Sequence, residues 1–128
     1  MTAPLVSLEE AQALLAIGYV CLDVRSEAEF SEGRARGAIN VPWRRTAPSG
    51  MEPNPDFLTQ SEAMFAHDTK LVVTCKANGR ALAAAEVLAS AGFVDVVVLR
   101  PGFDGLRDHF GSVVEPGWGR AGLPVESD

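Results

Sequence analysis

The sequence lacks the features that mark membrane, secreted and metal-stapled proteins. It has no apolar run near the roughly 18 residues that a membrane-spanning helix needs. Its first residues, MTAPLVSLEEAQ, are acidic and have no basic stretch followed by an apolar one, so no secretory signal is expected. The two cysteines, Cys21 and Cys75, form no CxxC pair, which argues against a disulfide framework or a metal site. This cysteine usage favours a reducing, cytoplasmic location.

Positive charge is also scarce. Lys and Arg number 11 against 17 Asp and Glu, which gives a formal net charge of −6. Such a field disfavours nucleic acid and anionic membranes as partners, although it leaves room for a local positive pocket. A length of 128 residues, with 47% of them hydrophobic, suits one domain over 1–128 with its own core.

Apolar spacing and end signals predict an alternation of helices and strands. A helix is expected over 5–17, begun by a capping box of Ser7 and Glu10 and stopped by Gly18, and a second box, Ser26 with Glu29, predicts a short helix over 27–32. Residues 44–56, rich in Pro and Gly, are expected to be a loop, and those from 117 onward a loose tail. Further helices are expected at 57–67, 80–91 and 105–110, and strands at 19–24, 37–42, 70–75 and 94–102, the last two strand segments each running into a turn.

The expected strands are continuously apolar, as strands of a parallel sheet covered on both faces are. Together with the alternation of helix and strand, this predicts a three-layer α/β domain with a mostly parallel central sheet.

Cys75 stands at the join between the strand-like run LVVT and a helix that begins near Arg80. Functional groups of open α/β sheets gather beyond the carboxyl ends of the strands. The first amides of the helix lack intrahelical acceptors, and the polar turn KANGR could turn several N–H groups inward to form an anion nest. With Lys76 and Arg80 nearby, the thiol pKa is expected to fall below its usual value, which would make Cys75 a nucleophile. The alternative is a small buried side chain at a strand end.

With these residues in view, the chain resembles the single-domain rhodanese family of sulfurtransferases along nearly its whole length. The resemblance is carried by five segments in family order: CLDVRSEAEF, EGRARGAINVPW, CKANGR with its helix, VVVLRPGFDGL and WGRAGLPVE. It implies the rhodanese-like fold and a reaction in which Cys75 takes the outer sulfur of a donor such as thiosulfate and passes it to cyanide or a thiol. No metal and no organic cofactor is implied.

The resemblance assigns the loop Lys76, Ala77, Asn78, Gly79 and Arg80 to binding of the anionic donor and the persulfide, with Arg80 binding the donor or bracing the loop. Asn78 stands where the family often has glycine, and because asparagine tolerates left-handed backbone angles better than most residues, the turn is expected to keep its shape. Ala81 stands where a hydroxyl is frequent, and Arg34 replaces a histidine, for which only a structural effect is expected. Phosphatases and arsenate reductases of this fold carry a loop one residue longer, so they are the weaker alternatives.

Asp23 and Arg25 are expected to form a pair that supports the end of their strand near the site. Trp43 and Arg44 follow an Asn-Val-Pro segment that lies near the pocket mouth in the family, where they would form an aromatic wall and attract an anionic donor; an exposed loop is equally compatible. Two further functions stay open: a non-catalytic rhodanese-like binding or regulatory module, and a persulfide relay to a partner protein. The physiological donor and acceptor, the pathway and the oligomeric state are not readable from the sequence.

Overall fold

A five-stranded parallel sheet forms the centre of the molecule in the computed structural model, which describes residues 3–128. The first two residues of the expected 1–128 domain lie outside this description. Every neighbouring pair in the sheet is parallel, which confirms the α/β fold with a parallel core that the sequence predicted. The strands, in sheet order, are β1 (Leu5–Val6), β8 (Asp95–Leu99), β7 (Lys70–Thr74), β2 (Val20–Asp23) and β4 (Ile39–Asn40).

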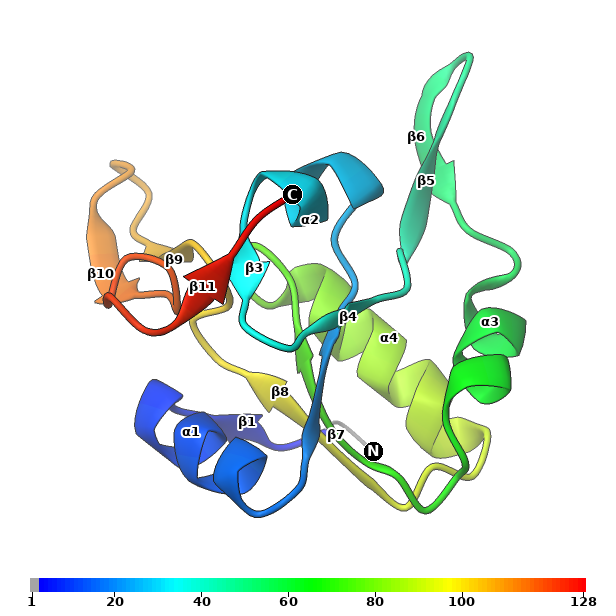
Figure 1. Ribbon diagram of the computed structural model, residues 1–128. Coiled ribbons are helices and arrows are strands. Elements are labelled where there is room, and N and C mark those ends of the chain that lie inside the picture. The colour runs from blue at the N-terminus through cyan, green and yellow to red at the C-terminus, as the bar shows by residue number, and fades with distance from the viewer. Residues whose placement is uncertain (1–2) are drawn as a thin grey trace.

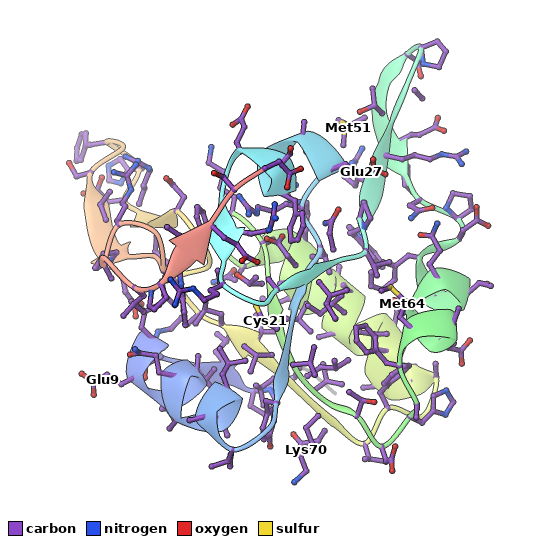
Figure 2. The ribbon with its side chains drawn as sticks, in the orientation of Figure 1. Glu9, Cys21, Glu27, Met51, Met64 and Lys70 are labelled. Atoms are coloured by element: carbon purple, nitrogen blue, oxygen red, sulfur yellow. The ribbon has the colours of Figure 1, made fainter. Side chains whose placement is uncertain are left out.

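Helices cover both faces of this sheet (Figure 1). On one face, Ala11 of α1 (Leu8–Ala16) packs with Val6, Val72 and Leu99. On the other, α4 (Gly79–Ser90) buries four small or branched side chains, and α3 (Phe57–Met64) adds Phe57. The short helix α2 (Glu27–Glu32) lies beyond the carboxyl ends of the strands. In Figure 2, Lys70 and Glu27, the first residues of β7 and α2, mark the two opposite ends of the sheet.

Both predicted capping boxes are confirmed. The Ser7 and Ser26 side chains accept from the backbone N–H of Glu10 and Glu29, and each glutamate accepts the N–H of its serine in return. The box at Ser7 also shows why the helix cannot begin at Leu5 as expected. Leu5–Val6 is instead an edge strand. The N–H of Val98 donates to the carbonyl of Pro4, and the N–H of Arg100 donates to the carbonyl of Val6, both at 2.8 Å.

Two expectations, one for a loop and one for a helix, were wrong. Residues 44–56 contain a hairpin of β5 (Arg44–Ala47) and β6 (Gly50–Pro53), in which Arg45 pairs with Glu52 at 3.1 Å. The helix expected at 105–110 is instead β9 (Gly105–Arg107), paired with β10 (Val113–Pro116). Gly105 has φ +125°, which no helix contains, and it lies against the carbonyl of Glu115, so a Cβ there would collide.

The C-terminal segment is not a loose tail. β11 (Val125–Glu126) pairs with β3 (Arg34–Ala35), so the end of the chain closes over α2. Asp128 accepts from Arg34 at 2.8 Å and from Ser31 at 2.6 Å, which gives Arg34 the structural role expected for it. A partner so far away in the sequence is invisible to any local pattern. No helix among residues 3–128 is long and apolar enough to cross a membrane.

Candidate active site

Cys75 follows the last residue of β7 and precedes α4 by a short turn, at the end of the sheet where the sequence placed it. Its side chain is only 2% exposed and contacts the core cluster that α4 covers. The thiol thus lies at the boundary between packed hydrocarbon on one side and the turn on the other.

Backbone amides of the turn point at this sulfur. The backbone N–H groups of Ala81, Arg80 and Ala77 lower the pKa of the Cys75 thiol, and two of them belong to the first turn of α4. Arg80 and Ala81 lie in the first turn of α4, where backbone N–H groups have no intrahelical acceptor and favour a negative charge nearby. Ala81 acts through its backbone N–H, so this position lacks only the additional donor that a side-chain hydroxyl would supply.

The expected lowering of the Cys75 pKa is wrong. Burial raises the pKa of the thiol above its ordinary value, and this effect outweighs the opposing amide hydrogen bonds and the charge of Arg80. The sequence shows where donors and cations stand, but it does not show how much water the sulfur loses. Cys21, the other cysteine, is buried within β2, and burial raises its pKa to about 12.

Arg80 braces the loop through Glu29 of α2. Its Nη1 and Nη2 donate to the two carboxylate oxygens of Glu29 at 2.8 and 3.2 Å. Hydrogen bonds from Arg80, helped by the N–H of Ser26, lower the pKa of Glu29 to about 2 against the opposing effect of burial. One carboxylate thus closes the capping box of α2 and holds the first turn of α4, and it neutralises the charge of Arg80.

The turn is formed with Asn78 in place of glycine and without a left-handed backbone at this residue. Its φ is −145°, and its side-chain amide donates to the carbonyl of Arg100 at 2.9 Å, which ties the turn to the end of β8. Gly79 has open space where a side chain would stand. The loop therefore reaches its shape by a tether to the neighbouring strand and needs no glycine at position 78.

The segment after β8 packs directly on the carbonyl side of the Cys75 turn. Phe103 and Asp104 donate their N–H groups to the carbonyls of Cys75 and Lys76 at 2.8 and 2.9 Å. Gly102 has φ +66°, and a Cβ on it would overlap the carbonyl of Ala77. Only glycine permits this approach, so the carbonyls are held outward while the amides of the same turn face the sulfur.

A cleft of about 520 Å³ opens above the thiol, a volume typical of small-ligand sites. Sequence reasoning assigned its first wall, the loop, but missed the second, which β9 and the residue before it provide. The glycine-rich stretch after Pro101 is the sequence signal for that wall, because its glycines allow the chain to pass close to the cysteine turn. The cleft is lined by Cys75, Lys76, Ala77, Gly79, Arg80, Asp104, Gly105, Leu106 and Arg107.

Asp23 and Arg25 form the expected pair beside the site. Both are buried, at 0% and 5% exposure, and Nη2 of Arg25 lies 2.7 Å from Oδ2 of Asp23. Asp23 stands opposite Thr74 in the sheet, one residue before Cys75, and Arg25 also donates to the carbonyl of Gly33 at 2.6 Å. The pair therefore fixes the end of β2 next to the cysteine and does not line the cleft.

Trp43 and Arg44 do not lie at the mouth of the Cys75 cleft, so the expectation for them is wrong. Trp43 packs edge-on against Phe57 at 5.0 Å and lines a hollow along α4. Arg44 lines a separate hollow beside α2 and donates to the carbonyl of Met51 at 2.9 Å. The hairpin they enter extends away from the sheet (Figure 1), which carries them from the site.

Comparison with known proteins assigns this geometry to a family. The chain is 38% identical over 122 residues to thiosulfate sulfurtransferase 16, chloroplastic, of Arabidopsis thaliana, covering 95% of this chain and 92% of that protein. It is 31% identical over 106 residues to thiosulfate sulfurtransferase 18 of the same plant, covering 81% and 78%. Other plant relatives are longer, and the chain spans between 54% and 61% of DIN1 of Raphanus sativus and of three Arabidopsis thaliana proteins.

Among solved structures, Rv0390 from M. tuberculosis superposes with a TM-score of 0.83 at 26% identity, with both chains covered fully. The family model of the rhodanese-like domain matches residues 7–109, a range that contains the cysteine turn and both walls of its cleft. This chain belongs to the rhodanese-like domain family.

Proposed function

We propose that this protein is a sulfurtransferase that moves a sulfane sulfur from an anionic donor such as thiosulfate to cyanide or a thiol through a persulfide on Cys75. The observation that carries the proposal is the place of Cys75: it lines an open cleft together with the turn that follows it, and the backbone amides of that turn lower the pKa of its thiol. The names of the relatives that match most of the chain support the same reaction class.

The proposed cycle has two displacements. The Cys75 thiolate attacks the outer sulfur of thiosulfate, so that a bond from Sγ to that sulfur forms and the sulfur–sulfur bond of the donor breaks. Its electron pair leaves with sulfite, and the negative charge of the thiolate passes to the outer sulfur of the persulfide. Cyanide then attacks that outer sulfur, which releases thiocyanate and restores the thiolate; a thiol acceptor takes the same role.

Burial explains why this site stabilises the anion of the Cys75 persulfide better than the Cys75 thiolate. In the thiolate, the charge sits on an atom that is only 2% exposed. In the persulfide, the charge moves outward by one sulfur–sulfur bond, roughly 2 Å, toward the cleft. The outer atom thereby regains solvent while it stays near the positive end of α4. The site thus favours the loaded state without needing a strongly acidic free thiol.

The test is mass spectrometry of the purified protein after incubation with thiosulfate. The expected result is a gain of one sulfur mass per chain, mapped to the Cys75 peptide and removed by cyanide. A Cys75→Ser variant should take up no sulfur, while Cys21→Ser should load like the wild type. An unloaded wild type across a panel of sulfane donors would contradict the proposal.

A non-catalytic binding module is the second candidate, because burial raises the pKa of Cys75 and so limits the thiolate available in the free protein. That candidate predicts a folded protein that accepts no sulfur and whose partner binding survives Cys75→Ser. A persulfide relay to a protein acceptor shares the first displacement with the proposed reaction and differs only in the second. Offering small-molecule and protein acceptors to the preloaded persulfide therefore separates the relay from transfer to cyanide or a small thiol. A cytoplasmic location remains a prediction.

A further inference from the structure

The cleft over Cys75 is a positive site on a negative protein. Its lining includes three cations, Lys76, Arg80 and Arg107, against one carboxylate, Asp104, whereas the whole chain carries −6. Arg80 is already engaged with both oxygens of Glu29. The cations that remain to meet a ligand are therefore Lys76, on the loop, and Arg107, on β9 across the cleft.

The main chain fixes the position of Arg107. It ends β9, which begins directly after the segment that donates two backbone hydrogen bonds to the carbonyls of Cys75 and Lys76. β9 is also held by antiparallel pairing with β10, in which Arg107 stands opposite Val113. The distance between its backbone and the cysteine turn is thus set by rigid pairing and by the close packing at Gly102.

The guanidinium of Arg107 keeps donors for a ligand. Its Nη1 donates to the carbonyl of Gly111 at 2.6 Å, which orients the group, and its Nη2 lies 3.4 Å from Asp104, a long contact. Asp104 is shared with Arg120, whose Nη2 lies 3.0 Å from the other carboxylate oxygen. One carboxylate between two arginines leaves positive charge uncompensated, and a guanidinium has five N–H donors in total.

Lys76 is exposed and takes part in none of the ion pairs found within residues 3–128. A flexible ammonium on one wall and an oriented guanidinium on the other suit an oxyanion with several acceptor oxygens. The sulfonate end of thiosulfate is such a group, and it becomes the sulfite that must leave.

We propose that Arg107 determines donor specificity: with Lys76 it binds the oxyanion end of the sulfur donor and so selects sulfonate-bearing donors over neutral ones. This inference rests on the proposed sulfur transfer for its biological meaning. The contact between Arg107 and an anion above Cys75 can be measured without any sulfur transfer.

The test compares alkylation of Cys75 by iodoacetate and iodoacetamide, which have the same leaving group and differ in charge. The ratio of the two rate constants cancels changes in thiolate fraction and reports the anion preference of the cleft. Arg107→Gln should lower the iodoacetate to iodoacetamide ratio by about 3- to 10-fold, the range expected when one charge contact in a partly exposed site is lost. Its iodoacetamide rate should stay near that of the wild type, which shows that the thiol and the fold are intact.

Arg120→Gln is the matched control, because it removes the same charge from the same carboxylate and Arg120 does not line the cleft. Its ratio should change less than about twofold. An unchanged ratio in Arg107→Gln, or an equal loss in both variants, would overturn the inference. The same variants in a thiosulfate assay should show a KM raised by Arg107→Gln and not by Arg120→Gln. If the wild type takes up no sulfur at all, the proposed function fails while the alkylation ratio still decides the role of Arg107.

Discussion

Replacing Glu29 by glutamine isolates the ion pair that joins α2 to the cysteine loop. Glutamine keeps an oxygen that can accept the Ser26 N–H, so the capping box survives. What the variant loses is the negative charge that accepts from both Nη1 and Nη2 of Arg80. We expect the free energy of unfolding to fall at neutral pH, because the two elements are then held by weaker, neutral hydrogen bonds.

The pKa of Glu29 sets the size of this loss. Its lowering from 4.5 to about 2 would correspond to about 3–4 kcal/mol, since each pKa unit is worth roughly 1.4 kcal/mol. The side chain is 33% exposed, so solvent screening reduces the effect, and part of the lowering comes from Ser26, which glutamine retains. We therefore expect Glu29→Gln to cost about 1–2 kcal/mol at pH 7.

The pH dependence follows from the sign of the change. Because the folded pKa is depressed, the stabilisation by Glu29 is fully present above the unfolded pKa of 4.5 and is lost as pH falls toward 2. Urea unfolding at pH 7, 5 and 3.5 should show a gap between wild type and variant that is constant above about pH 5.5 and shrinks below 4.5. Glu10→Gln is the matched control, because Glu10 closes the capping box of α1 without a bidentate arginine. A gap that stays constant down to pH 3.5, or an equal loss in Glu10→Gln, would refute the reasoning.

Two further predictions concern the cysteine turn. Gly102→Ala should lower the free energy of unfolding by more than about 3 kcal/mol, because the methyl group meets the Ala77 carbonyl in addition to the strain of a left-handed backbone. Gly122→Ala is the control: at φ +76° with open space around it, it should lower the free energy of unfolding by only about 1–2 kcal/mol in the same urea titration. Because burial raises the pKa of Cys75, its iodoacetamide rate should stay low at pH 7 and rise with an inflection above the ordinary value, as followed by peptide mapping against Cys21. A rate that is already at its plateau at pH 7 would show that the amides outweigh burial.

The strand, turn and helix around Cys75 could be predicted from the local sequence. The apolar run before Cys75, the polar turn and the helix-forming run after it are consecutive, so strand, turn and helix could be predicted together. The amides that meet the sulfur belong to that same stretch, since Ala77, Arg80 and Ala81 lie within six residues of it. The Asp23 and Arg25 pair is equally local, two residues apart at a strand end.

Most of the wrong expectations about secondary structure concern strands that form only by pairing, with a neighbouring segment in the hairpins and with a distant segment at the chain end. The strand β9 forms only by pairing with β10 across a turn, and its own residues do not show this pairing. The chain end is ordered because β11 pairs with β3, about 90 residues earlier in the sequence. The expected place of Trp43 at the pocket is wrong because the local sequence does not show in which direction the β5–β6 hairpin leaves the sheet. Such contacts are decided by which backbone edges remain unpaired once the core has formed.

Local sequence patterns were enough to predict the parallel α/β fold, the capped helices and the position of Cys75 at the carboxyl end of β7, because propensity, capping and apolar periodicity act over a few neighbouring residues. Only the tertiary structure decided the state of that site. It buried the thiol enough to raise its pKa, engaged Arg80 with Glu29, and brought Arg107 to the opposite wall. Desolvation and charge pairing depend on what surrounds a group in space, and that surrounding comes from segments far apart in the chain.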